Sequence, residues 1–443
     1  MIRIKYICYV VIVVVLFLPL FQKVLPVVRV KPLEGSYKLA EEPAFSFHDF
    51  FNNTFQDQYI PYFEQHIGFR PALVRINNQI AFSCFNMALA QDVILGKKGV
   101  LFEVFYIKAY LGRDFTGTEK WDRYAEKLKA ISDSLDKNNT ALLIVFAPGK
   151  GTFFPEYIPD KFKPWQKDTT NQEYLMQRLK EKQIRFIDAN HWFTRMKDNA
   201  PYPLYPKTGI HWSSYGEGLF LDSIIRYMER DKGKTMVDFG WNEVTMSNDL
   251  RVPDHDIAKG MNLIFDVPHY AMPYPEFYYR EDASTFKPVV ITIADSYNWN
   301  LFGRGITQKI YSQDKFWYYF RAAYGPYPKD QQVKNLDIPA ELRSADFVIL
   351  MATDATLSHF DFGFTDQVYD MITVEGRKAA GERAAMIAEA ERNIRNNKEW
   401  MELIREKAAK RNITVDEMIH IDAVWMADKK LREKGNRTDP GAE

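Results

Sequence analysis

Four short, largely apolar segments limit the folds open to this 443-residue chain more than any other feature. The first, ALLIVFA at 141–147, stops at Pro148-Gly149, and the others are IRFID at 184–188, VVITIA at 289–294 and DFVILM at 346–351. Apolar runs without alternation are typical of parallel strands that are buried on both faces of a sheet. We therefore predict an α/β fold, with a doubly wound parallel sheet and flanking helices.

Helical patterns lie between the predicted strands. Residues 118–138 form a clear amphipathic helix, because Tyr124, Leu128, Ile131 and Leu135 recur with the helical period. The further elements that we expect are helices at 71–90, at 172–182 and after Leu219, and two short strands around the Gly-Lys-Lys-Gly turn within 92–102.

The first segment determines the compartment of the chain. Arg3 and Lys5 precede an uncharged apolar run at 6–21, which continues to Val28 if Lys23 extends its amine to the membrane surface. The run then provides the roughly 20 residues that a bilayer-spanning helix needs. No small-x-small cleavage site follows it, so we favour an uncleaved signal anchor over a cleaved signal peptide, with the later residues outside the cytoplasm.

These patterns divide the chain into three parts. We expect a transmembrane signal anchor at 1–30, an α/β domain at 31–373 and a helical C-terminal extension at 374–443. The extension is charged and rich in alanine, which suits a solvated helical appendage, and a docking surface for a partner is the alternative.

Composition argues against several classes of function. Lys+Arg and Asp+Glu are balanced at 58 each, so we expect no nucleic-acid partner. There are two cysteines, and Cys8 lies within the first apolar run, which excludes a cysteine-rich zinc site. Asp254, His255 and Asp256 are adjacent and no H-E-x-x-H motif occurs, so we expect no metal and no cofactor.

Polar residues follow the ends of three predicted strands, namely Lys150, Asp188 and the pair Asp295-Ser296. In open α/β sheets, ligands bind in the crevice beyond the carboxyl ends of the strands. Ser296 comes directly after a buried strand, where backbone N–H groups of the next turn can hold an oxyanion. No G-x-S-x-G motif is present, so the α/β-hydrolase fold is not supported.

A second candidate segment is KTGIHWSSYGEGL at 207–219, a polar turn with glycines that leads into an apolar helical pattern. His211 in this turn can exchange protons near neutral pH, and the neighbouring Trp212 lowers the local dielectric. His211 and Ser296 together fit the pairing of a base with a nucleophile. The residues alone reveal no obvious acid to orient the imidazole.

TGIHWSSYG, followed further along by IADSYNWN, resembles the SGNH hydrolase-like periplasmic proteins with a DHHW-type motif, which include the alginate O-acetylation proteins. GFRPALVRINNQI, VILGKKGVLFE and VFAPGKGTFFPEYIP extend this resemblance over much of 45–370. The resemblance implies a single-pass protein of the bacterial inner membrane whose domain at 31–373 faces the periplasm. It further implies O-acetyl transfer to exopolysaccharide hydroxyls, with acetyl groups supplied by a membrane-bound acyltransferase.

Carried over by position, the resemblance makes Ser296 the nucleophile and His211 the general base, and it places Lys150 near the cleft. The family's aspartate lies two residues before the histidine, where this chain has Gly209. Replacing a triad aspartate even by an amide can cost about 10⁴ in rate. Another carboxylate could orient the ring, with Asp188 the first candidate and Asp256 the second, or a backbone carbonyl could do so. Further candidates for contact with substrate or oxyanion are Asn298 and Trp212.

Three functions are therefore open at this point. The first is an O-acetyltransferase acting through Ser296 and His211, and the second is an esterase that releases acetate from glycans. The third is a catalytically impaired subunit that binds glycan or assists assembly, which the glycine at position 209 would allow.

Overall fold

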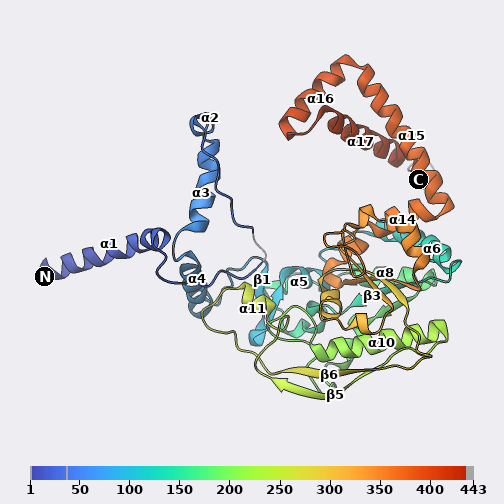
Figure 1. Cartoon of the computed structure of the whole chain (residues 1–443), viewed down its shortest axis with the longest axis horizontal. Helices are drawn as coiled ribbons and strands as arrows, with labels where there is room; N and C mark the ends of the chain where they lie inside the picture. Colours follow the sequence, from blue (N-terminus) through green and yellow to red (C-terminus); the bar gives the residue numbers. More distant parts are fainter. Residues whose placement is uncertain (1, 36–37, 436–443) are drawn as a thin grey trace.

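The computed structural model of the chain describes residues 2–35 and 38–435 (Figure 1). Its centre is a six-stranded sheet in the order β4-β3-β10-β7-β8-β9, in which β9 alone runs antiparallel to its neighbour. The strands are β3 (Ala141–Ala147), β4 (Phe186–Asp188), β7 (Val289–Ala294), β8 (Gln313–Tyr318), β9 (Ala322–Tyr324) and β10 (Phe347–Thr353). The predicted α/β fold is confirmed, and all four predicted strands belong to this sheet.

Both faces of the sheet are covered, as the apolar runs predict. Along β3, Leu143 and Val145 pack into one buried cluster, whereas Leu142 and Ile144 pack into a second cluster on the opposite face. Helix α10 (Ser214–Lys232) contributes to the first cluster. The helices of the second face are α6 (Thr118–Asp136), α8 (Asn171–Glu181), α13 (Ile338–Ser344) and α14 (Phe364–Ile372).

β8 and β9 were not predicted, because polar residues interrupt the apolar pattern of β8. Asp314 and Lys315 are both buried in this strand. Asp314 accepts a hydrogen bond from the Thr307 hydroxyl, and Lys315 forms an ion pair with Glu341 at 2.7 Å. Buried polar groups that are paired in this way are compatible with a central strand, but a sequence pattern does not reveal the pairing.

The carboxyl ends of three neighbouring strands open onto short helical turns. β3 leads into α7 (Lys150–Phe153), β7 leads into a 3₁₀ turn at Ser296–Asn298, and β10 leads into a longer 3₁₀ segment at Asp354–Gly363. Other short helices of this domain are α5 (Val104–Tyr110), α9 (Ala189–Met196) and α12 (Trp299–Phe302).

Two small antiparallel sheets lie outside the central sheet. The predicted pair within 92–102 is β1 (Val93–Leu95) and β2 (Leu101–Glu103). The second pair, β5 (Asp238–Ser247) and β6 (Met272–Arg280), was not predicted. The chain between β5 and β6 carries a short helix, α11 (Asp256–Gly260), which packs near β2.

The N-terminal helix α1 (Ile2–Val24) projects away from the domain (Figure 1). Within it, Ile4–Val24 has a mean hydropathy of 2.5 and none of its apolar side chains is buried, so the helix is apolar enough to cross a membrane. Three helices follow before β1, namely α2 (Phe47–Phe51), α3 (Thr54–His66) and α4 (Arg70–Phe85).

The C-terminal extension consists of α15 (Val374–Asn396), α16 (Lys398–Arg411) and α17 (Val415–Gly435). These helices have a small core of their own, which includes Ile394, Ile404 and Ile419. Figure 1 shows them beyond α14, at the opposite end of the molecule from α1. Residues 436–443 of the predicted extension lie outside the described residues.

Candidate active site

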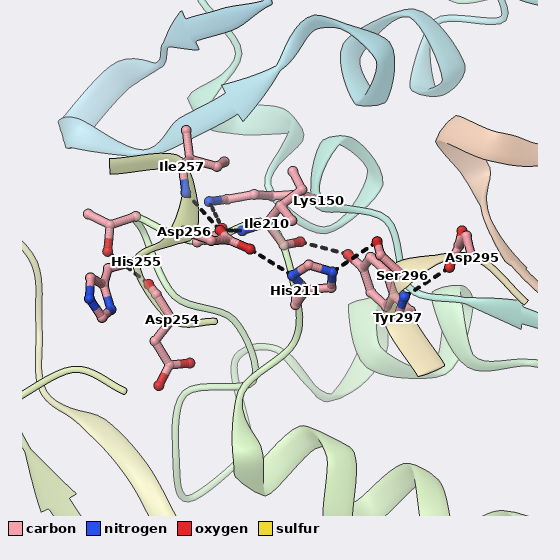
Figure 2. Close-up of polar contacts among 12 residues, drawn as sticks. Lys150, Ile210, His211, Asp254, His255, Asp256, Ile257, Asp295, Ser296 and Tyr297 are labelled. Carbon is pink, nitrogen blue, oxygen red and sulfur yellow. Dashed lines mark hydrogen bonds and ion pairs between the residues drawn. The ribbon is translucent and has the colours of Figure 1, made fainter. Parts of the chain in front are cut away.

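The structure brings His211 and Ser296 together and adds a carboxylate to them (Figure 2). His211 Nε2 lies 3.2 Å from Ser296 Oγ, and His211 Nδ1 lies 2.8 Å from Asp256 Oδ2. The three residues come from the loop before α10, the turn after β7 and the start of α11. Nucleophile, base and orienting acid have this connectivity in serine-dependent acyl transfer.

The turn that carries Ser296 is held from beneath by Asp295. The Asp295 carboxylate is buried, and it accepts hydrogen bonds from Tyr297 N at 3.0 Å, Thr353 N at 3.2 Å and Thr356 Oγ1 at 2.7 Å. These bonds tie the end of β7 to the end of β10. Asp295 therefore fixes the turn and leaves the Ser296 side chain facing the histidine.

Two buried tyrosines tie the histidine loop to the sheet. The Tyr297 hydroxyl donates to the Ile210 carbonyl at 2.6 Å and lies 2.8 Å from the Tyr205 hydroxyl, which in turn donates to the Pro148 carbonyl. The Tyr297 ring also packs against the His211 ring, with 4.7 Å between centroids. Neither tyrosine was predicted from the sequence, because an isolated tyrosine outside a regular element has no motif to distinguish it.

Lys150 has a different place from the predicted one. Its side chain is fully buried, and Nζ donates to the carbonyls of Lys207 and Gly209 in the histidine loop. Burial lowers the pKa of Lys150 to about 7, although the nearby Asp256 and Glu103 carboxylates oppose this shift. Lys150 therefore holds the histidine loop in place, and its side chain is not exposed to solvent.

Both oxygens of the Asp256 carboxylate have defined partners. Oδ1 accepts from the backbone N–H groups of Ile210 and Ile257, each at 2.8 Å, and Oδ2 faces the imidazole. The side chains of His211 and Asp256 are 12% and 27% exposed, so the pair is shielded from water yet open at one side. A carboxylate held by two amides cannot turn away from the ring without losing those bonds.

Gly209, the position of the family's aspartate, has no space for a side chain. A Cβ there would lie 2.3 Å from the Pro253 carbonyl oxygen and 2.7 Å from the Asp254 carbonyl carbon. The chain before α11 therefore lies directly against residue 209. This close approach puts Asp256 beside His211, so the glycine and the new carboxylate belong to one arrangement.

Asp188 was the first candidate for the acid, and the structure places it elsewhere. Its Oδ1 accepts from Gln172 Nε2 and from the backbone N–H of His191, both at 2.9 Å, at the start of α9. Asp188 caps a helix and does not contact His211, so the prediction was wrong. The second candidate, Asp256, occupies the position.

Trp212 was predicted to contact substrate or oxyanion, but it is fully buried among Phe193, Phe220 and Tyr297. It belongs to the core behind His211. Asn298 ends the 3₁₀ turn that begins at Ser296 and is 5% exposed. Its role at an oxyanion stays a prediction.

Among residues 2–35 and 38–435, no group of three or more His, Cys, Asp or Glu side chains is arranged to hold a metal ion. The site itself brings together a hydroxyl, an imidazole and a carboxylate in sequence. This set can accept and pass on an acyl group.

Comparison with known proteins gives a match over part of the domain. Residues 93–237 match the family model described as SGNH hydrolase-like domain, acetyltransferase AlgX. No curated protein matches the chain.

Three solved structures are similar to the chain at low identity. They are the O-acetyltransferase domain of Pseudomonas putida AlgJ (13% identity, 63% of this chain and 99% of that chain, TM-score 0.41), Pseudomonas aeruginosa AlgX (12%, 62% and 66%, 0.39) and Bacillus cereus PatB1 with a sulfonyl adduct (10%, 61% and 99%, 0.40). The family match contains His211 and ends before Asp256 and Ser296. It confirms the resemblance that the motifs indicated: residues 93–237 are similar to the SGNH hydrolase-like domain of the acetyltransferase AlgX.

Proposed function

We propose that the chain is a membrane-anchored, extracytoplasmic O-acetyltransferase that moves acetyl groups onto exopolysaccharide hydroxyls. The observation that carries the proposal is the unbroken contact from Ser296 Oγ through the His211 ring to Asp256, with distances of 3.2 and 2.8 Å. The family match at 93–237 supports acetyl transfer as the reaction class. The carboxylate at Asp256 removes the reason to expect a catalytically impaired protein.

In the first half-reaction, His211 Nε2 takes the proton of the Ser296 hydroxyl as Oγ attacks the carbonyl carbon of the acetyl donor. Asp256 accepts a hydrogen bond from Nδ1–H and stabilises the imidazolium that forms. The tetrahedral intermediate collapses, the bond to the donor's leaving group breaks, and His211 returns its proton to that group. Acetyl-Ser296 and neutral imidazole remain.

In the second half-reaction, a sugar hydroxyl takes the place of the leaving group. His211 Nε2 accepts the hydroxyl proton as the sugar oxygen attacks the acetyl carbonyl, and the Ser296 Oγ–carbonyl bond then breaks. The proton passes from His211 to Ser296 Oγ. The products are the acetylated sugar and the free enzyme.

The cellular setting of this reaction follows from the first helix. We propose that α1 crosses the bacterial inner membrane once and that the domain at 31–373 lies in the periplasm, with residues 374–443 as a helical extension. The apolar stretch Ile4–Val24 supports the anchor. A membrane-bound acyltransferase would then supply acetyl groups, and a polysaccharide would accept them.

Acetylation of Ser296 by a small activated ester tests the proposal. The full chain is incubated in detergent with p-nitrophenyl acetate, and intact mass is followed with time. We expect one acetyl adduct on the wild type and none on Ser296→Ala. Ser284→Ala, which changes an exposed turn serine, is the matched control and should behave as the wild type. Equal labelling of wild type and Ser296→Ala would refute the proposal.

The second half-reaction separates a transferase from an esterase. If the adduct persists in water and disappears when an oligosaccharide acceptor is added, with acetate appearing on the sugar, the protein is a transferase. Rapid release of free acetate without acceptor would make it an esterase.

A further inference from the structure

The segment between α1 and β1 exposes many large apolar side chains. Residues 45–89 carry more of them than the whole of residues 93–373. Seven lie on residues 45–66, which we call the α2–α3 arm, namely Phe45, Phe47, Phe50, Phe51, Tyr59, Ile60 and Phe63. Phe47 and Phe51, at its tip, are 73% and 80% exposed. A concentrated apolar surface of this kind marks a site of contact with a partner or a membrane.

The base of the arm is packed against the carboxyl end of α1. A Cβ at Gly68 would lie 2.2 Å from the Pro19 carbonyl oxygen, so the turn after the arm touches the helix backbone. Lys23 Nζ lies over the rings of Tyr62 and Phe63, at 5.2 and 5.3 Å from their centroids. The arm therefore begins at the level where α1 ends. Figure 1 shows it running across the line of α1.

We propose that the α2–α3 arm lies in the interfacial layer of the outer leaflet, as a membrane-surface element beside the membrane helix. The inference rests on the proposed anchoring, because α1 must span the bilayer for its carboxyl end to lie at the surface. Aromatic side chains favour this layer, and amphipathic helices bury an apolar face about 5–10 Å into it. The bilayer is the occupant because the exposed rings continue directly from the end of the membrane helix.

Charge on the arm identifies the type of attraction. Residues 45–66 contain no lysine and no arginine, while Asp49, Asp57 and Glu64 are acidic. Anionic headgroups therefore provide no attraction, and burial of apolar side chains is the driving force. The arm should bind zwitterionic and anionic bilayers alike.

Helix α4 transmits this placement to the active site. One face of α4 exposes Leu73, Ile76 and Ile80 at helical spacing. From α4, Asn78 donates to the Met261 carbonyl at 2.8 Å, and the Gln79 side-chain oxygen accepts from Ile264 N and Phe265 N, both at 3.0 Å. Met261 directly follows α11, which carries Asp256. An arm fixed at the surface thus holds the proposed catalytic residues at a defined height above the membrane.

Spin labels on the full chain test the inference. In a Cys8→Ser/Cys84→Ser background, single labels are placed at Val14→Cys in α1, Phe51→Cys on the arm and Ile421→Cys on the C-terminal extension. All three positions are exposed, so the substitutions leave the packing intact. The labelled protein is reconstituted into phosphatidylcholine vesicles, and collisions with oxygen and with a water-soluble nickel chelate are measured.

We expect the labels at residues 14 and 51 to collide more often with oxygen than the label at residue 421 does. Their collisions with the nickel chelate should be several-fold less frequent than those of the label at residue 421. Adding anionic lipid should leave the result unchanged. If residue 14 is in the bilayer but residue 51 is as water-exposed as residue 421, the inference is overturned and the anchor stands. If residue 14 is itself in water, the proposed anchoring fails. If residue 51 is protected only when anionic lipid is present, burial of apolar side chains is not the driving force and the inference is overturned.

Discussion

The two partners of His211 are supplied by very different regions of the molecule. Ser296 follows β7 directly, in a turn fixed by Asp295 within the central sheet. Asp256 comes from the excursion between β5 and β6, outside that sheet, and reaches the ring because Gly209 lets the two loops touch. The proposed nucleophile thus depends on the geometry of a strand end, whereas the proposed acid depends on an approach between two loops.

The serine and the carboxylate therefore differ in how freely their positions can vary. A strand end in a parallel sheet fixes the serine position through neighbouring strands, so the residue cannot move without moving the sheet. A carboxylate needs only to reach Nδ1, and any loop that passes close enough can provide it. In this chain the carboxylate has a backbone cradle of its own, the N–H groups of Ile210 and Ile257.

Replacing the acid should have the largest effect in this comparison. We expect Asp256→Asn to lower the rate of Ser296 acetylation by about 10⁴, as removal of tautomer control does in a serine triad. Burst kinetics with p-nitrophenyl acetate measure the rate. The matched control is Asp188→Asn, which keeps a good N-cap residue at the start of α9 and should leave the rate nearly unchanged. The reverse ranking would show that Asp188 is the acid after all.

Placing the family's aspartate at residue 209 should destabilise the protein and should not replace Asp256. Because a Cβ at residue 209 would meet the Pro253 carbonyl oxygen at 2.3 Å, Gly209→Asp forces the two loops apart. We expect a loss of about 1–3 kcal/mol in the free energy of unfolding from overpacking, measured by urea denaturation. In the Asp256→Asn background, Gly209→Asp should recover no activity. Recovery would mean that the two acid positions are interchangeable and that the approach of the loops is incidental.

The position of Ser296 at a strand end could be predicted from the sequence, whereas the carboxylate that reaches His211 could not. Burial on both faces leaves a continuous apolar run, so β3, β7 and β10 were found, and the strand-end serine followed from β7. Strand order has no such signature. Asp188 ends β4, which is three strands away from β7 in the order β4-β3-β10-β7, a distance of about 14 Å at about 4.8 Å per strand.

Asp256 was the weaker candidate for a related reason. Its position depends on the contact between residues 209 and 253, which are distant in the sequence, and on β5 and β6, which no pattern revealed. Gly209 was noted only as a missing aspartate. A glycine also allows another backbone to approach closely, and only the position of the Pro253 carbonyl in the structure shows that Gly209 serves this purpose.

The smallest expected effect concerns Lys150, which holds the histidine loop in place, and it is a change in how the free energy of unfolding depends on pH. Burial lowers the pKa of Lys150 to about 7 in the folded chain, whereas an unfolded lysine has a pKa of about 10.4. Between these values the unfolded chain binds more protons than the folded one, so the free energy of unfolding rises with pH. The slope cannot exceed one proton, about 1.4 kcal/mol per pH unit.

Lys150→Met should remove this rise between pH 7 and pH 10, because the buried amine is gone. Urea denaturation at several pH values measures the slope, and Lys161→Met, which changes a solvent-exposed lysine, should keep the slope of the wild type. Lys150 Nζ also donates to the Lys207 and Gly209 carbonyls. The variant should therefore acetylate Ser296 more slowly than the wild type, even at a pH where the two proteins are equally stable. If the free energy of unfolding depends on pH in the same way for the wild type and Lys150→Met, Lys150 keeps its charge throughout this range. Its contribution to the site is then limited to its hydrogen bonds with the histidine loop.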